Sequence, residues 1–223
     1  QAILKDIDIN DQEKVDDALF YRDISYVVYI PENYQFLDVD EIFQFLDKRK
    51  NILDGVCISG GEPLMQEKLI PFLKEIKKRG YEIKLDVTGN YLDRLKEIVD
   101  AKLVDYIAMD VKNTKGKYAL TVGSESENFP VESIDACISF IRTCGIPYEF
   151  RTTIVRELHT KEDLIAMAKW LKGADAWYLQ QFQDSPNCIQ EGFHSYNKQE
   201  MLEILEAVKQ YVPNAEVRGI KED

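Results

Sequence analysis

Basic residues and long apolar runs are both scarce in this sequence. Lys and Arg together number 28 against 40 Asp and Glu, which gives a formal net charge of −12. Such a chain repels phosphate backbones and anionic membrane surfaces. No apolar run approaches the roughly 20 residues that cross a bilayer, and the first residues lack the basic and then apolar segments of a secretory signal. The sequence therefore predicts a cytoplasmic protein that binds neither nucleic acid nor membranes.

Metal-ligating side chains are also few. The four cysteines form no C-x-x-C pair and are too scattered for a disulfide framework, so reduced thiols are expected. They are Cys57, Cys137, Cys144 and Cys188. The only two histidines, His159 and His194, stand alone in the sequence, and we expect them to be surface groups rather than ligands.

What the chain does have is a regular alternation of strand-like and helix-like segments. Strands are predicted over 25–30, 55–60, 82–89, 105–113, 147–155, 176–182 and 216–219, and helices over 39–51, 72–80, 91–103, 131–145, 160–173 and 197–212. Pro71 stands where it would start the second helix, and Gly80 is expected to cap its end. Strands separated by single amphipathic helices build a parallel sheet with right-handed crossovers.

About six βα units fit this pattern, fewer than the eight of a closed barrel. The sequence therefore predicts an α/β fold with a parallel sheet, either an open, partial TIM-like barrel or a doubly wound sheet. A single domain over 1–223 is expected, with a polar N-terminal extension over 1–20. The longest predicted loop, 113–129, is of a length that is usually functional or mobile.

Ligands of parallel α/β folds bind beyond the carboxyl ends of the strands, where charged and amide groups of this chain gather. A buried ionic cluster without a ligand is costly, so these groups favour a polar, charged or zwitterionic ligand. They are Ser59-Gly60-Gly61-Glu62-Pro63, Asp86 with Thr88 and Asn90, Asp110 with Lys112 and Asn113, Arg151 with Thr152 and Thr153, and Gln180 with Gln181.

Each of these groups also has a structural interpretation. Gly60-Gly61 could be a tight turn that leads to a helix starting at Pro63. Asp86 and Asp110 could be N-caps of the following helices. Lys112 could be solvated or paired with Asp110, and Arg151 could form a structural ion pair. The position of all of them at corresponding strand ends favours the functional interpretation.

The ordered motifs ISGGEP, LDVTGN, MDVK, EFRTT and LQQF resemble the radical S-adenosylmethionine (radical SAM) family, over about Pro31 to Gly219. The likeness is strongest to the activating proteins of anaerobic ribonucleoside-triphosphate reductase, and more distant to those of pyruvate formate-lyase. It implies a partial (β/α)6 barrel, S-adenosylmethionine (SAM) as a cofactor, and as partners a glycyl radical enzyme and an electron donor. LDVTGN departs from the more usual DTNG at Val87 and Thr88, which puts one or two polar contacts in doubt.

The resemblance also implies roles for the strand-end residues. The GGEP backbone would lie against the methionine end of SAM, where side chains at Gly60 or Gly61 would block the approach. Asp86 and Asp110 would face the polar part of the SAM site and could surround a small cation there. Lys112 and Arg151 would meet the carboxylate or ribose of SAM. The cofactor-binding set implied in this way is Gly60, Gly61, Glu62, Pro63, Asp86, Thr88, Asp110, Lys112, Arg151 and Gln181.

One defining family feature is missing. The family holds a four-iron four-sulfur cluster with a C-x-x-x-C-x-x-C loop after the first strand, because iron of this kind needs thiolates. With Pro31 matched to the family's proline beyond that loop, an ungapped alignment puts Tyr21, Ser25 and Val28 at the cysteine positions. Alternatively the segment 21–29 is the first strand itself and the loop is lost, which is the interpretation that the strand-like residues favour.

No other set of cysteines replaces the missing loop by sequence. Cys137 and Cys144 have the spacing of the outer pair, but Ile141 fills the middle position on a predicted helix, so both are expected in the core. In the family, the cluster passes an electron to SAM, and the resulting 5′-deoxyadenosyl radical takes a hydrogen atom from a glycine of the partner. Without thiolates we see no route for that electron.

Three functions follow for testing. The first is a glycyl radical enzyme activase of the radical SAM family, in a form without its cluster loop. The second is a non-catalytic module on the same fold that binds SAM or docks a partner. The third, an aldolase or isomerase with Lys112 as a Schiff-base amine, has little support, because Lys112 is not obviously in an apolar pocket. No catalytic residue and no metal ligand is assigned from the sequence.

Overall fold

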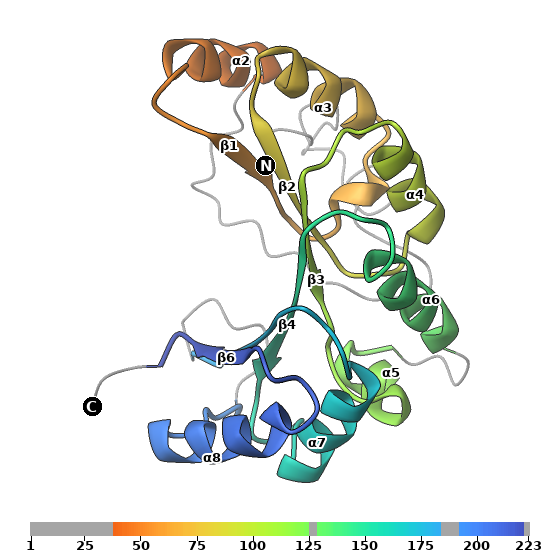
Figure 1. Ribbon diagram of the computed structural model, residues 1–223, viewed down its shortest axis with the longest axis vertical. Helices are drawn as coiled ribbons and strands as arrows, with labels where there is room; N and C mark the ends of the chain where they lie inside the picture. The colour runs from red at the N-terminus through yellow and green to blue at the C-terminus, as the bar shows by residue number, and fades with distance from the viewer. Residues whose placement is uncertain (1–37, 125–128, 184–191, 221–223) are drawn as a thin grey trace. The chain divides into compact units, whose positions relative to one another are not determined.

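A computed structural model of the protein describes residues 38–124, 129–183 and 192–220. Six strands form one sheet in the order β1-β2-β3-β4-β5-β6 (Figure 1). The β1–β2, β4–β5 and β5–β6 pairs are all parallel. The strands are β1 (Gly55–Ile58), β2 (Glu82–Val87), β3 (Tyr106–Asp110), β4 (Tyr148–Ile154), β5 (Trp177–Gln181) and β6 (Ala215–Arg218).

This strand order confirms the predicted α/β class and parallel sheet. A doubly wound sheet reverses its strand order at a switch point, and no reversal occurs among these six strands. The sequential order is that of a βα barrel. The predicted strand over 25–30 lies outside the described residues.

The helices follow the strands in the predicted alternation. They are α2 (Val39–Lys48), α3 (Leu69–Lys78), α4 (Leu92–Asp100), α5 (Tyr118–Thr121), α6 (Val131–Ile141), α7 (Lys161–Trp170) and α8 (Lys198–Lys209), with short 3-10 helices η2 (Pro63–Met65) and η3 (Lys115–Lys117). Within the described ranges, no helix combines the length and the apolar character needed to cross a membrane.

Two sequence predictions about local structure need correction. Helix α3 begins at Leu69 rather than at Pro71, which is its third residue and still lies in the first turn, where a missing N–H costs no helical hydrogen bond. The expected loop 113–129 contains η3 and α5. Gly80 follows the end of α3 with φ 83°, a conformation that suits glycine at this position.

The chain divides into two compact units, 1–108 with 133–147 and 109–132 with 148–223. In unit 1, α3 and α4 lie on the same side of β2 (Figure 1). The alternation of β2 turns Ile83, Leu85 and Val87 into the core and leaves Lys84 and Asp86 on the opposite face. Leu69, Leu73 and Ile76 of α3 and Leu95 and Ile98 of α4 complete this core, all fully buried.

In unit 2, α7 and α8 pack side by side on one face of the strands (Figure 1). Phe150 and Ile154 of β4 and Trp177 and Leu179 of β5 face these helices and are completely buried. The opposite face of the same strands carries polar residues, Arg151 and Thr153 on β4 and Tyr178 and Gln180 on β5. The single domain expected from the sequence stays a prediction.

Candidate functional site

The turn after β1 exposes its backbone. A Cβ atom added to Gly60 or Gly61 would meet no protein atom within 4 Å. Gly61 also has no positive φ, so neither packing nor backbone conformation requires glycine at this position. Glycine at this position leaves the backbone open to close approach by another group.

Glu62 ties this turn to the end of β2. Its Oε1 accepts a hydrogen bond from the Leu64 N–H at 3.0 Å, which caps η2, and Pro63 is the first residue of that helix. Its Oε2 accepts the Thr88 N–H at 2.8 Å and the Thr88 hydroxyl. The Asn90 side-chain amide donates to the same hydroxyl at 3.1 Å. Glu62 and Thr88 thus hold the shape of the glycine turn.

Asp86 lies on the polar face of β2. Its Oδ1 is 3.5 Å from the Lys84 ammonium, and its side chain is only 13% exposed. Lys84 also lies over the Tyr106 ring of β3 at 5.8 Å. Asp86 does not cap the following helix, whose N-cap residue is Tyr91, so the N-cap interpretation is wrong for this residue.

In unit 2, Asp110 forms an ionic triad with Lys112 and Arg151. The Lys112 ammonium donates to Oδ2 of Asp110 at 2.9 Å, and Nε of Arg151 donates to Oδ1 at 3.0 Å. Burial alone would raise the pKa of Asp110, but the charges and hydrogen bonds of Lys112 and Arg151 outweigh it and hold that pKa below its usual value. One anion between two cations leaves a net positive group at the strand ends, which suits a carboxylate ligand.

The backbone beside this triad is held by two buried rings. The Tyr118 hydroxyl accepts the Lys112 N–H at 3.3 Å and donates to the Asp110 carbonyl at 3.4 Å. Nε2 of His159 lies 2.7 Å from the Lys112 carbonyl, and its Nδ1 lies 3.2 Å from the Val155 N–H. A neutral ring protonated at Nε2 satisfies both contacts, a tautomer that is assigned from these partners.

The prediction that His159 is a surface group is therefore wrong. The residue is 1% exposed, and burial lowers its pKa although the main-chain bonds to Lys112 and Val155 act in the opposite direction. Sequence reasoning missed this residue because its partners are 47 and 4 positions away in the chain. His194 is a surface group as expected, with its side chain 71% exposed.

Gln181 lies apart from the triad within unit 2. It shares the buried face of β5 with Trp177 and Leu179, and its amide donates to the Tyr196 carbonyl at 2.7 Å. Gln180, its neighbour, is exposed on the face that carries Arg151. The period-two alternation of β5 was the signal in the sequence that could have separated the two glutamines.

The structure thus brings the predicted residues together in two groups. Within unit 1 the turn of Gly60, Gly61, Glu62 and Pro63 joins Thr88, with Asp86 next to it on the polar face of β2. Within unit 2 the triad of Asp110, Lys112 and Arg151 forms, and Gln181 lies on the other face of the strands. The role of all ten residues in cofactor binding remains a prediction.

No metal-binding group of three or more Cys, His, Asp or Glu side chains occurs within 38–124, 129–183 and 192–220. Cys57 is exposed on β1, and Cys144 is half-buried after the end of α6 rather than in the core. Cys137 is buried in α6 as expected, and burial raises the pKa of its thiol to about 12, far from a thiolate ligand. Cys188 and the positions Tyr21, Ser25 and Val28 lie outside the described residues.

A comparison with protein families matches residues 20–171 to the radical SAM superfamily. The chain is 31% identical over 198 residues to a Methanocaldococcus jannaschii protein provisionally named a glycyl-radical enzyme activating enzyme, covering 85% of this chain and 80% of the relative. A second protein of the same organism and the same kind of name is 28% identical over 159 residues, covering 69% and 60%.

Solved structures share the fold. A domain of a pyruvate-formate lyase-activating enzyme from Bacteroides vulgatus matches with a TM-score of 0.61 and 18% identity, over 74% of this chain and 99% of that chain. Streptococcus suis SuiB bound to S-adenosylmethionine matches with a TM-score of 0.63 and 13% identity, over 84% of this chain and 45% of that chain. A Sphaerobacter thermophilus radical SAM methyltransferase matches with a TM-score of 0.66 and 12% identity, over 81% of this chain and 56% of that chain. At these identities the likeness shows the fold alone.

Proposed function

The chain belongs to the radical SAM superfamily, and from this premise we propose that it binds SAM. The candidate contact within unit 1 is the glycine turn after β1, and the candidate within unit 2, taken by itself, is the Asp110 triad. The observation that carries the proposal is the bare backbone at Gly61, which no contact within the described residues and no positive φ explains. The carbonyls of such a turn can accept hydrogen bonds from the ammonium group of SAM. Within unit 2, the net positive triad suits a carboxylate.

The residues fit SAM through complementary charges. Lys112 and Arg151 supply donors at Asp110, with side chains 35% and 20% exposed and therefore partly accessible. Glu62 and Thr88 would act by holding the turn, since their hydrogen bonds go to each other and to the nearby backbone. Asp86 lies beside Lys84, and Gln181 donates to the Tyr196 carbonyl. Neither of these contacts supports a direct contact with SAM.

The iron–sulfur cluster of the family fits less well. The 223 residues contain no C-x-x-x-C-x-x-C sequence, and the three described cysteines do not converge. In the family, SAM and a reduced cluster together supply a carbon radical that abstracts hydrogen. The role proposed for this chain is to bind and orient SAM.

We propose further that the partner is a glycyl radical enzyme, of the anaerobic ribonucleoside-triphosphate reductase type, supplied with electrons by a separate donor. The provisional names of the two Methanocaldococcus jannaschii relatives support the general class of partner. The reductase type rests on the ordered motifs ISGGEP, LDVTGN, MDVK, EFRTT and LQQF. The cytoplasmic location expected from the sequence stays a prediction.

The second candidate is a non-catalytic module that binds SAM or docks the same partner. The absence of the cysteine triplet from the sequence favours it. The Schiff-base alternative has lost support, because the Lys112 ammonium is paired with Asp110 at 2.9 Å and that chemistry needs an uncharged amine.

Calorimetric titration with SAM tests binding. Gly61→Ala should abolish saturable binding and leave the thermal unfolding midpoint unchanged, because the added methyl meets no protein atom. Gly116→Ala is the matched control, since Gly116 also has open space and no positive φ. Equal SAM affinity in wild type and Gly61→Ala would contradict the assignment of the turn.

Iron and sulfide analysis after anaerobic reconstitution, followed by an assay for 5′-deoxyadenosine, separates the two candidates. Bound cluster with SAM cleavage supports the activase. SAM binding without iron supports the non-catalytic module, and borohydride trapping with a carbonyl substrate would expose the Schiff-base alternative.

A further inference from the structure

Helix α3 carries a basic surface on an otherwise acidic chain. Five basic residues and two acidic ones occur between Glu67 and Arg79, whereas the whole chain has a net charge of −12. We call the α3 basic surface the set Pro71, Lys74, Glu75, Lys77, Lys78 and Leu103, which lines one open pocket of about 540 Å³ within unit 1.

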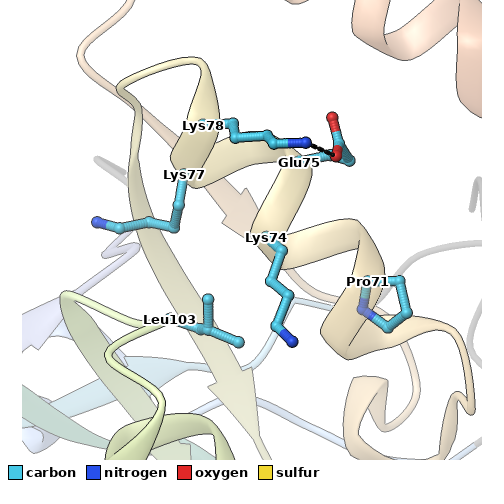
Figure 2. A pocket seen from close by; sticks show the side chains of 6 residues that line it. All are labelled: Pro71, Lys74, Glu75, Lys77, Lys78 and Leu103. Atoms are coloured by element: carbon cyan, nitrogen blue, oxygen red, sulfur yellow. Dashed lines mark hydrogen bonds and ion pairs between the residues drawn. The ribbon is translucent and has the colours of Figure 1, made fainter.

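The lysines of this surface are not equivalent. The Lys77 ammonium contacts both carboxylate oxygens of Asp105 at 2.8 Å, and the Lys78 ammonium contacts Glu75 at 2.8 Å. Lys74 is exposed and has no ion pair or hydrogen bond within the described part of the chain. In Figure 2 its side chain extends between the side chains of Leu103 and Pro71.

Helix electrostatics explain only part of this arrangement. Lys77 and Lys78 lie in the last turn of α3, where cations interact favourably with the helix dipole. Lys74 lies outside that turn, and neither the dipole nor a carboxylate partner accounts for it. The pocket is also lined by the apolar side chains of Pro71 and Leu103, so lysines and apolar groups lie on the same surface.

We propose that the α3 basic surface docks an acidic segment of a partner protein, with carboxylates at Lys74 and Lys78 and one apolar side chain between Pro71 and Leu103. Charge complementarity supports this occupant. An acidic partner is repelled by a chain of net charge −12 and is attracted where basic side chains gather, so the surface selects both the partner and its orientation.

An anionic lipid surface is the less favoured occupant. Membrane attachment through charge needs clusters of about four to eight basic residues and no large opposing charge. This surface has three lysines, and the chain as a whole is acidic. The proposal stands independently of SAM binding, since no residue of this surface belongs to the site proposed for SAM.

The test uses the full chain and a fluorescein-labelled twelve-residue peptide of Asp and Glu with one central Leu. We expect saturable anisotropy that weakens with added salt. The double variant Lys74→Glu with Lys78→Glu should weaken binding on the order of tenfold, because two attractions become repulsions. Replacement of the central Leu by Ser in the peptide should also weaken binding.

The matched control is Lys161→Glu with Lys198→Glu, which makes the same change in net charge at exposed first residues of α7 and α8. It should bind the peptide like wild type. The single variant Lys74→Gln, which reverses no charge on the helix, guards against misfolding of the double variant and should weaken binding by a smaller factor. Urea unfolding of every variant checks the fold.

Several results would overturn the proposal. These are no saturable binding to wild type, an equal loss in the control pair, equal binding of a peptide with Lys in place of Asp and Glu, and no effect of Lys74→Gln. Binding to phosphatidylserine vesicles that is lost in the same α3 variants, with no peptide binding, would assign the surface to lipid instead.

Discussion

Two strand-end carboxylates, Glu62 in unit 1 and Asp110 in unit 2, are held in opposite ways. The bonds described for Glu62 come from neutral donors, the N–H groups of Leu64 and Thr88 and the Thr88 hydroxyl. Asp110 instead receives two cations, Lys112 and Arg151. The contrast indicates that Glu62 fixes the shape of a backbone turn, whereas Asp110 sets the balance of charge.

The largest effect is expected for Asp110→Ala. The variant leaves two partly buried cations without their shared anion, at a cost of about 2 kcal/mol once solvent exposure is allowed for. SAM affinity should fall as well, because the cations are no longer held in place. Urea unfolding and calorimetry measure the two effects.

Asp93→Ala is the control for this variant, because the Asp93 side chain is fully exposed beside Lys96 and its loss should change neither quantity. Asp110→Asn sharpens the comparison, since it keeps the shape of the side chain and removes only the charge. Wild-type stability and affinity in Asp110→Asn would show that charge is not what Asp110 contributes.

Glu62→Gln comes next, at about 1.5 kcal/mol, because the amide keeps one acceptor oxygen and turns its N–H donors toward the donors of either Leu64 or Thr88. Its SAM affinity should fall even at high salt, since the turn rather than a charge is disturbed. The exposed Glu97→Gln serves as a control with no expected change. A loss of SAM affinity in Glu62→Gln that depends on salt would contradict the proposed difference between Glu62 and Asp110.

A pH effect is expected from His159 in unit 2. Because burial lowers its pKa in the folded state, the unfolded chain takes up a proton first, below about pH 6.5. The stability that the neutral ring contributes is complete above that pH and is lost as pH falls toward the folded pKa, with a slope of at most about 1.4 kcal/mol per pH unit.

Urea unfolding between pH 8 and pH 5 checks this slope. His159→Gln should flatten the profile in that range. Since the pKa of Asp110 is held below its ordinary value, Asp110 stays ionised throughout the range and does not contribute to the slope. An identical slope in His159→Gln would mean that another group is responsible.

The smallest effect is expected for Thr88→Val, about 0.5 to 1 kcal/mol, because the variant removes one hydroxyl and keeps the N–H bond to Glu62. Thr88→Ser keeps the hydroxyl and should recover most of that loss. Denaturant midpoints of the pair give the difference. If the Val variant were as stable as the Ser variant, the backbone N–H of Thr88 alone would account for the stabilising contact with Glu62.

Local patterns were sufficient for the fold. The alternation of strand-like and helix-like segments along the chain predicted the parallel sheet, because strands separated by single amphipathic helices pair parallel through right-handed crossovers. The helices within 113–129 were missed, since helices of three and four residues carry too little periodicity to be recognised.

The site was only partly predictable for a related reason. The turn at Gly60-Gly61 and the polar strand ends are local signals, and they were found. The pairing of Glu62 with Thr88, 26 positions apart, and of His159 with Lys112, 47 apart, depends on the packing of distant segments. No spacing rule in one sequence gives such contacts, which is why a buried histidine was taken for a surface group.

The last described strand has a consequence for how the molecule is made. Arg218 of β6 contacts the buried carboxylate of Glu149 on β4 at 3.3 Å and lies over the Tyr178 ring of β5. During synthesis β4 and β5 emerge from the ribosome before this cation exists. Unit 2 can therefore complete its folding only after residue 218 has emerged, and a translation pause just before it would hold the nascent chain in an unfinished state.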